Sequence, residues 1–207
     1  MLPIEIKIKS GIMSAKKKQK KSFVKIVKWI AVAVSAIILY LAYIFFAPNI
    51  NPPTDEKSYL CIPDSSTFAD VTRLLEKNTN VFNVSSFKQV SELLQYGAKI
   101  RSGRYEIKKG MNNFQLVRIL RSGRQTPVRL KFNNIRTKKQ LAARLSSQVM
   151  ADSVSILNLL DNETFLAEYH LNPATSISIF IPNTYEVFWN MNAKQLFEKM
   201  NKEYLKF

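Results

Sequence analysis

The chain has 207 residues and a formal net charge of +16, from 31 lysines and arginines against 15 aspartates and glutamates. Hydrophobic residues make up 46% of it, which is enough for a packed core and excludes a disordered chain. One cysteine and one histidine exclude a disulfide framework and a Cys/His zinc site. Cys61 and His170 both lie in apolar strings, where a lone thiol is usually inert, so a Cys–His catalytic pair is disfavoured.

The positive charge is concentrated in two separate zones. Residues 1–28 carry nine lysines and one acid, and residues 99–144 carry fourteen bases and one acid. Residues 29–98 and 145–207 are each slightly acidic. Each basic zone therefore needs its own explanation.

The first basic zone ends where a hydrophobic run begins. Residues 29–47 are nineteen residues without a charge, and a helix of this length is about 28 Å long, close to the thickness of the hydrocarbon layer of a bilayer. We predict one transmembrane helix there, with residues 1–28 as a basic cytoplasmic tail and the rest of the chain outside the inner membrane. The alternative is a cleaved signal peptide, but bulky residues before Pro48 favour an uncleaved anchor.

Residues 48–57, which include adjacent prolines, are predicted to be a short extended linker. After it, a strand, a tight turn and a capped helix recur three times. The expected caps are Thr67, Asn112 and Thr137, each with an Asp or Gln three residues later whose side chain can reach back to the N–H of the cap. Apolar pairs spaced four residues apart then face a core, namely Val71 with Leu75, Leu116 with Leu120, and Leu141 with Leu145. The pattern predicts a small α+β module, which by itself names no function.

Two stretches carry a resemblance to a known family. Residues 103–123 contain G-x-Y-x-I, then Gly-Met, a helix and a closing L-x-x-G, which resembles the LysM-like subdomain of YceG/MltG-type endolytic murein transglycosylases. Residues 180–188 (FIPNTYEVF) resemble the L-x-P-D-T-Y-E-F segment of that family. With the N-terminal membrane helix, the resemblance covers about residues 25–207. The matching residues of the first stretch are Gly103, Tyr105, Ile107, Gly110, Met111, Leu120 and Gly123.

The resemblance implies an α+β fold with a single N-terminal transmembrane helix. A LysM-like subdomain is expected at residues 58–125 and the N-terminal part of a YceG-like catalytic domain at residues 126–207. The family continues well beyond the segment that matches the last helix here, so we expect a truncated form that is weakly active or inactive alone. Apolar side chains of that helix are expected to face an absent partner, namely Phe197, Met200, Tyr204 and Phe207.

The activity implied by the resemblance is that of a lytic transglycosylase. Such an enzyme cleaves MurNAc-β-1,4-GlcNAc bonds of nascent glycan strands, leaves 1,6-anhydroMurNAc ends and terminates glycan elongation. The muramic C6 hydroxyl attacks its own anomeric carbon, so one carboxylic acid is sufficient: it protonates the leaving oxygen and then accepts the C6 proton. No cofactor and no metal are expected.

The usual family string E-G-x-x-x-P-D-T-Y has a Glu five residues before the proline, where this chain has Ile177, and Asn183 replaces the Asp. Glu186, the nearest carboxylate, is therefore the candidate catalytic acid. Tyr185 and the aromatic run after it are expected to supply an apolar setting that raises a carboxyl pKa. An ordinary solvent-facing role is the alternative for Glu186. Asn183, Thr184 and Tyr185, on an expected loop, are candidate substrate-binding residues, although turn formation explains the first two nearly as well.

The expected partners are peptidoglycan glycan strands, the inner membrane and cell-wall synthases. For the basic zone at residues 99–144 we expect peptidoglycan with its anionic stem peptides first and anionic lipid second, because an exported domain does not meet nucleic acid. The leading hypothesis is an inner-membrane-anchored transglycosylase. The alternative is a non-catalytic membrane-anchored peptidoglycan-binding or scaffold protein, which Ile177 and Asn183 favour. A basic membrane-tethered module without enzymatic activity is a third reading.

Overall fold

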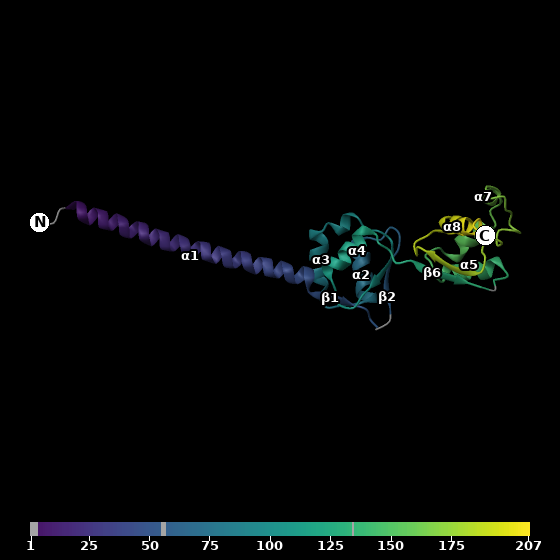
Figure 1. The fold of residues 1–207 in the computed structure, drawn as a ribbon, viewed down its shortest axis with the longest axis horizontal. Coiled ribbons are helices and arrows are strands. Elements are labelled where there is room, and N and C mark those ends of the chain that lie inside the picture. The colour runs from purple at the N-terminus through teal and green to yellow at the C-terminus, as the bar shows by residue number, and fades with distance from the viewer. Residues whose placement is uncertain (1–3, 55–56, 134) are drawn as a thin grey trace. The chain divides into compact units, whose positions relative to one another are not determined.

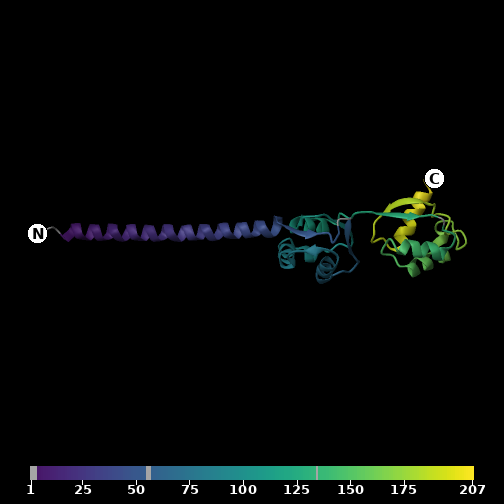
Figure 2. The ribbon, with the colours of Figure 1, turned by 90° about the horizontal axis from the view of Figure 1, so that it is seen from below.

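The structure is a computed structural model that describes the backbone of residues 4–54, 57–133 and 135–207, and the side chains of these ranges from residue 25 onward. The chain divides into two compact units, residues 1–47 and 48–207. The first contains one long helix. The second is a mixed α and β structure in which short antiparallel sheets pack against helices (Figure 1 and Figure 2).

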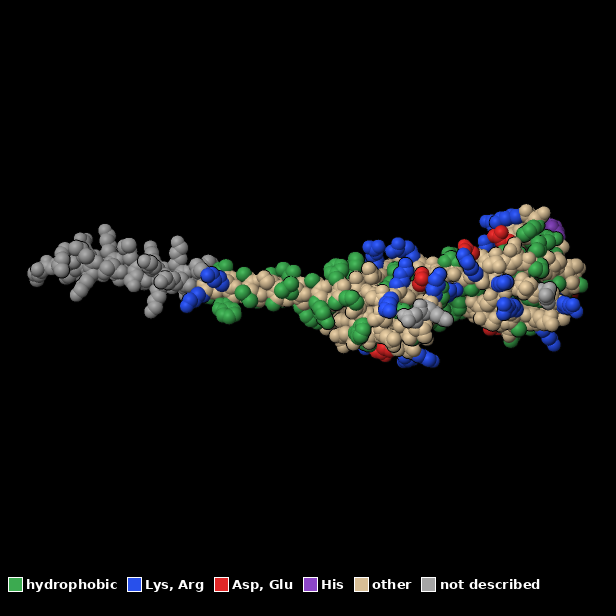
Figure 3. Space-filling model, turned by 60° about the horizontal axis from the view of Figure 1, so that its bottom comes forward, with side chains coloured by type: hydrophobic (Ala, Val, Ile, Leu, Met, Phe, Trp, Pro, Cys, Tyr) green, Lys and Arg blue, Asp and Glu red, His purple; other side chains and the backbone are tan. Residues whose placement is uncertain are grey.

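Helix α1 (Ile4–Phe46) forms the first unit. Its segment Lys25–Phe46 is long and apolar enough to cross a membrane. Trp29 and Leu39 are 74% and 70% exposed in this segment. Figure 3 shows hydrophobic side chains, in green, exposed along the helix. A continuous row of exposed apolar side chains is stable in lipid and unfavourable in water, which supports the predicted span.

The structure differs from the predicted boundaries of this span. The predicted helix at residues 29–47 lies inside α1 except for Ala47, which follows the helix. The predicted basic tail at residues 1–28 is helical from Ile4, because lysine is a good helix former and no proline or glycine pair interrupts this stretch. Residues 1–3 and the side chains up to residue 24 lie outside the described part of the chain.

Residues 48–57 are not a free linker along their whole length. Strand β1 (Pro48–Asn51) is the middle strand of a three-stranded sheet and pairs antiparallel with β3 (Asn80–Val81) and β5 (Met111–Asn112). Ile50 in its middle is fully buried. The extended backbone was predicted, but the pairing was not, because both partner strands are distant in the sequence.

The part of the second unit that runs from residue 48 to residue 125 contains a second, two-stranded sheet. Strands β2 and β4 pair antiparallel in a continuous register, from Ser58 opposite Ile107 to Ile62 opposite Gly103. Helices α2, α3 and α4 and a short 3-10 helix, η1, complete this part. The elements are β2 (Ser58–Ile62), α2 (Phe68–Asn78), α3 (Val84–Leu93), η1 (Tyr96–Ala98), β4 (Gly103–Ile107) and α4 (Asn113–Ser122).

Two of the predicted capping boxes are confirmed. At α2 the side chain of Thr67 accepts a hydrogen bond from the Asp70 amide, and the Asp70 carboxylate accepts one from the Thr67 amide at 3.0 Å. At α4 Asn112 and Gln115 make the same reciprocal pair. These caps satisfy amide donors that the first turn of a helix otherwise leaves without partners.

The third cap is confirmed only in part. The Thr137 side chain accepts from the amide of Gln140, but the Gln140 side chain accepts from the amide of Arg136 rather than from the cap itself. The apolar residues predicted to face a core are all fully buried, whereas Lys108 and Lys109 are exposed as the turn position predicts. The buried residues are Val71, Leu75, Leu116, Leu120, Leu141 and Leu145.

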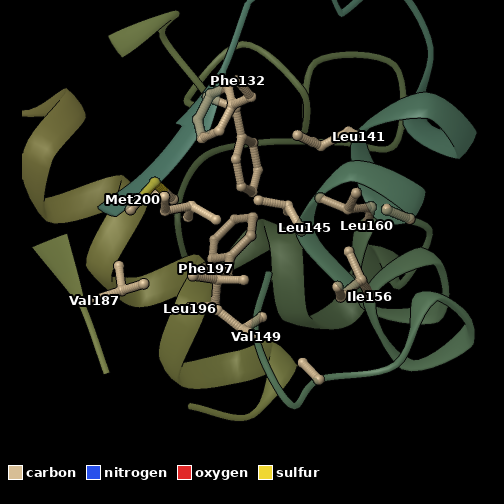
Figure 4. Close-up of a cluster of buried hydrophobic side chains, with 14 of the residues drawn as sticks. Phe132, Leu141, Leu145, Val149, Ile156, Leu160, Val187, Leu196, Phe197 and Met200 are labelled. Carbon is tan, nitrogen blue, oxygen red and sulfur yellow. The ribbon is translucent and has the colours of Figure 1, made fainter. Parts of the chain in front are cut away.

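Residues 126–207 build a hydrophobic cluster of their own around an antiparallel pair of strands (Figure 4). The pair consists of β6 and β7, and helices α5, α6, α7 and α8 contribute side chains to the same cluster. The elements are β6 (Val128–Phe132), α5 (Lys138–Ser146), α6 (Ser153–Leu160), α7 (Glu163–Ala167), β7 (Asn183–Val187) and α8 (Ala193–Tyr204).

Helix α8 corrects one expectation from the sequence. Phe197 and Met200 do not face an absent partner: each is 1% exposed and lies in the hydrophobic cluster. The Phe197 ring contacts the rings of Phe165 and Tyr169 edge-on, with centroids 5.0 Å and 5.2 Å away. Tyr204 and Phe207 are exposed, as expected. Helix α8 is amphipathic as predicted, but its apolar face packs against the hydrophobic cluster of residues 126–207.

Candidate functional site

Glu186 lies in the middle of β7, on the outer surface of the β6–β7 pair. Side chains alternate along a strand, so the neighbours Tyr185 and Val187 point into the core while the Glu186 side chain is 68% exposed. The apolar setting predicted for this carboxylate is therefore absent. The aromatic and aliphatic neighbours in the sequence occupy the opposite face of the strand.

The closest cation to Glu186 comes from the neighbouring strand. Arg129 of β6 is the register partner of Glu186, and its Nε lies 4.0 Å from Glu186 Oε1. Lys131 lies opposite Thr184 in the same way, two register pairs further along the sheet. An exposed pair at this distance contributes little to stability. Both side chains are therefore free to turn toward a ligand.

The three predicted substrate-binding residues lie on strand β7 and not on a loop. Asn183 and Thr184 are exposed, and the Thr184 amide donates to Asn183 Oδ1 at 2.7 Å. Tyr185 is mostly buried: its ring stacks on Phe132 with centroids 5.6 Å apart, and its hydroxyl donates to the carbonyl oxygen of Ile181 at 2.7 Å. Burial raises the pKa of Tyr185. Tyr185 thus fixes the strand from inside, while Asn183 and Thr184 face outward.

Glu186 and the three predicted substrate-binding residues nevertheless line one pocket. Its volume is about 410 Å³, and its other wall comes from the second half of α8 and the residues after it. A single sugar ring with its N-acetyl group fits a hollow of this size, which lies within the range of small-molecule sites. The lining residues are Asn183, Thr184, Tyr185, Glu186, Lys199, Glu203, Lys206 and Phe207.

The α8 wall carries a carboxylate that the sequence interpretation missed. Glu203 Oε1 accepts a hydrogen bond from Lys199 Nζ at 2.7 Å, and Glu203 Oε2 accepts one from Lys206 Nζ at 2.9 Å. These hydrogen bonds and positive charges lower the pKa of Glu203 to about 2. Glu203 is therefore held as a carboxylate by its two lysines, and Glu186 is the other acidic residue that lines this pocket among the described residues. The i, i+4 and i, i+3 spacings in α8 were the signal that predicts this network.

Ile177, at the place of the family glutamate, lines a different pocket of about 250 Å³. The walls come from β6, the turn after it and the segment before β7, and they are mostly apolar, with Asn133, Arg136 and Ser178 as polar members. No carboxylate lines this pocket among the described residues. The residues that match the family string therefore line two separate pockets. Ile177 lines the pocket that has no carboxylate among the described residues, and Asn183 lines the pocket that contains Glu186.

The fold and these hollows define a mixed α+β protein with a candidate membrane helix and a polar pocket on a two-stranded sheet. The YceG-like family model matches residues 60–207, and the chain belongs to the YceG-like family. This confirms the family that the sequence resemblance indicated.

Among solved structures, the crystal structure of a yceG-like protein from Listeria monocytogenes is similar to the chain. The two share 22% sequence identity with a TM-score of 0.37, and the match covers 73% of this chain and 55% of that one. The chain thus spans about half the length of that relative. None of the curated proteins matches the chain.

Proposed function

We propose that the protein is an inner-membrane-anchored endolytic transglycosylase that cleaves MurNAc-β-1,4-GlcNAc bonds of nascent peptidoglycan and so terminates glycan elongation. The match of the YceG-like family model to residues 60–207 carries this proposal. The apolar segment Lys25–Phe46 supports the membrane anchor. The lysines of residues 1–28 favour a cytoplasmic N-terminus, which leaves the α+β unit on the outer side, where peptidoglycan is built.

In the proposed reaction Glu186 acts first as an acid and then as a base. Protonated Glu186 donates its proton to the glycosidic oxygen, which leaves with GlcNAc as the C1–O bond breaks. The C6 hydroxyl of the same MurNAc forms the new bond to C1, and its proton passes to the Glu186 carboxylate. No water is consumed and Glu186 ends protonated, ready for another cycle.

The surroundings of Glu186 support a role in binding glycan. Asn183 and Thr184 present amide and hydroxyl groups to the same hollow, and such groups hydrogen-bond the N-acetyl and hydroxyl groups of a sugar. Lys199 and Lys206 bring positive charge, which suits the carboxylates of stem peptides. The sheet formed by β2 and β4 with its capped helices supports the LysM-like prediction for residues 58–125, where a second glycan contact is proposed.

A non-catalytic peptidoglycan-binding or scaffold protein is the second candidate. The exposure of Glu186 and the isoleucine at position 177 favour it, because a general acid that works near neutral pH usually lies in a more enclosed setting. In this version the pocket on β7 binds glycan, and the membrane helix holds the synthesis machinery near it.

An assay on purified sacculi separates the two functions. The full chain in detergent is mixed with sacculi, and both the protein that sediments with them and the muropeptides that are released are measured. A transglycosylase releases anhydro-muropeptides, and Glu186→Gln lowers this release by about 10²–10⁴-fold while sedimentation persists. A scaffold protein sediments but releases nothing. Absence of both sedimentation and release would contradict both candidates.

A further inference from the structure

A pocket of about 430 Å³ opens beside α4, far in the sequence from the β7 site, and its rim is cationic. Four basic side chains line it: Lys99, Arg101, Arg118 and Arg121. Among the described residues no carboxylate lines this pocket, and none of the four cations forms an ion pair with an acid. Four positive charges around one hollow without a counter-charge favour an anionic ligand.

Arg101 is held in place by two specific features. The hydroxyl of buried Tyr105 donates to the Arg101 carbonyl oxygen at 3.0 Å. The Arg101 side chain lies against Gly123, where an added Cβ would come within 2.5 Å of the Arg101 Cδ. Gly123 also ends α4 with a φ of 69°, so glycine meets both needs at this position. The Arg101 charge thus offsets the negative end of the α4 dipole.

The floor of the same pocket is apolar. Leu94, Phe114 and Val117 form it, with Val117 fully buried and the other two half-buried. The Arg118 guanidinium lies 5.9 Å from the centroid of the Phe114 ring. A ligand that matches both the rim and the floor has an anionic group joined to an apolar body. A phospholipid has this chemistry, and inorganic phosphate does not.

A buried hydrogen bond ties the start of α4 to the chain segment that follows α1 in the sequence. Asn113, the first residue of α4, accepts a hydrogen bond at Oδ1 from Asn49 Nδ2 at 2.7 Å, and both residues are buried. Asn49 follows the last residue of α1, Phe46, by three positions, and three residues span at most about 10 Å. The start of α4 is therefore hydrogen-bonded to the residues that directly follow the proposed anchor in the sequence.

Phe82 is a second feature tied to this point of the chain. Its side chain is 76% exposed, and its backbone N–H donates to the carbonyl oxygen of Asn49 at 2.9 Å. Phe82 is thus hydrogen-bonded to the segment that follows the proposed span, and an exposed aromatic side chain there suits the interfacial layer, where aromatic rings are enriched.

We propose that the pocket beside α4 binds the headgroup of an anionic phospholipid of the membrane that α1 crosses. The phosphate lies among Lys99, Arg101, Arg118 and Arg121, and the apolar floor contacts the acyl side of the lipid. This inference rests on the membrane anchoring of the proposed function but not on its catalysis. It gives four cations of the basic zone at residues 99–144 a role, which is to hold the domain against the membrane surface.

Photocrosslinking from within the pocket tests this proposal. A photoreactive amino acid replaces Ser122, which is exposed and lines the pocket. The full chain is placed in micelles with equal amounts of phosphatidylglycerol and phosphatidylcholine, and captured lipid is identified by mass spectrometry. A probe at this position reports lipid bound in the pocket and not lipid attracted by the lysines of residues 1–28.

Phosphatidylglycerol is expected to be captured about tenfold more than phosphatidylcholine, because each cation near a lipid surface favours anionic lipid. The double variant Arg118→Gln/Arg121→Gln should lower this capture on the order of tenfold. The matched control Lys77→Gln/Lys88→Gln removes two exposed lysines of the same part of the chain that do not line the pocket, and should leave capture within about twofold. Circular dichroism confirms that each variant is folded.

Equal capture of the two lipids, or unchanged capture by the double variant, would overturn the proposal. Displacement of the lipid by inorganic phosphate at equal concentration would assign the pocket to free phosphate, and displacement by soluble muropeptides would assign it to glycan; each result overturns the lipid assignment. If the chain with an unaltered pocket cleaves glycan but captures no phosphatidylglycerol, the result contradicts this inference alone. Loss of cleavage with intact capture contradicts the proposed function alone.

Discussion

Arg129 lies directly opposite Glu186 across the β6–β7 pair, with its Nε 4.0 Å from Glu186 Oε1. The two side chains are 82% and 68% exposed, so the pair lies on the open surface of the sheet. An ion pair of this kind contributes at most about 1 kcal/mol to stability. Changes at either residue are therefore expected to act on ligand binding or chemistry and to leave folding almost unaffected.

Core packing predicts a large difference between two leucines of the same part of the chain. Leu116 of α4 is fully buried, whereas Leu93 of α3 is 58% exposed. Leu116→Ala should lower the free energy of unfolding by about 2–5 kcal/mol, because it removes buried contacts and leaves a cavity. Leu93→Ala should change it by less than about 0.5 kcal/mol. Urea unfolding of both variants measures this, and equal losses would show that the packing is misassigned.

Asn49 is predicted to hold the start of the second unit together. Its side-chain amide donates to the Asn83 carbonyl at 2.9 Å and to Asn113 Oδ1 at 2.7 Å, and its Oδ1 accepts from the Asn83 amide at 2.7 Å. Asn49→Ala removes these partners inside a buried network, which should cost about 1–3 kcal/mol. Asn80→Ala is the control, since Asn80 is exposed and donates only a long bond of 3.4 Å to Pro52. Similar thermal midpoints for the two variants would contradict this account.

Glu203 should make stability depend on acid pH. Its pKa in the folded protein is about 2, below the ordinary value of 4.5, because Lys199 and Lys206 hydrogen-bond the ionised form. A lowered pKa means that the stabilisation is complete above about 4.5 and is lost as the pH falls toward about 2. Urea midpoints measured across this window should fall less steeply for Glu203→Gln than for the unaltered chain. Glu198→Gln, at an exposed pair with Lys194, is the control, and identical slopes for Glu203→Gln and the unaltered chain would refute the role of Glu203.

The proposed topology places residue 207 outside the inner membrane. Alkaline phosphatase fused after Phe207 should be active in bacterial cells, because this reporter folds only after export and the lysines of residues 1–28 keep the N-terminus inside. The same fusion without the apolar segment Lys25–Phe46 should be inactive. If the fusion of the full chain is produced at a normal level but is inactive, the helix either has the opposite orientation or does not span the membrane, and the proposed topology is wrong.

Local signals in the sequence predicted helices α2, α4 and α5 and the caps at their starts, whereas α6 and α7 were not predicted. The cap at Thr67 with Asp70 depends on residues three positions apart, and the burial of Leu116 and Leu120 depends on spacing along one helix. Such features are encoded within a few residues, so a single sequence is enough to predict them.

The pairing of strands that are distant in the sequence was not predicted. The register that brings Arg129 beside Glu186 joins two strands that are separated in the sequence by the three helices α5, α6 and α7, and no local pattern specifies it. The pairing of β1 that replaced the expected linker is of the same kind. The exposure of Glu186 was predictable, because Tyr185 and Val187 alternate with it and strand neighbours face opposite sides. The aromatic neighbours were assigned to the same environment as Glu186 when they belong to the other face.

The mass of the products that the full chain releases from purified glycan strands tests the central claim most directly. The account predicts MurNAc ends that are lighter by one water than hydrolysed ends, since the C6 hydroxyl replaces water as nucleophile. Glu186→Gln should lower this release by about 10²–10⁴-fold, the usual contribution of a general acid, while Glu198→Gln leaves it unchanged. Hydrolysed ends, or full release of anhydro products by Glu186→Gln, would contradict the assignment of Glu186 as the acid of a transglycosylase.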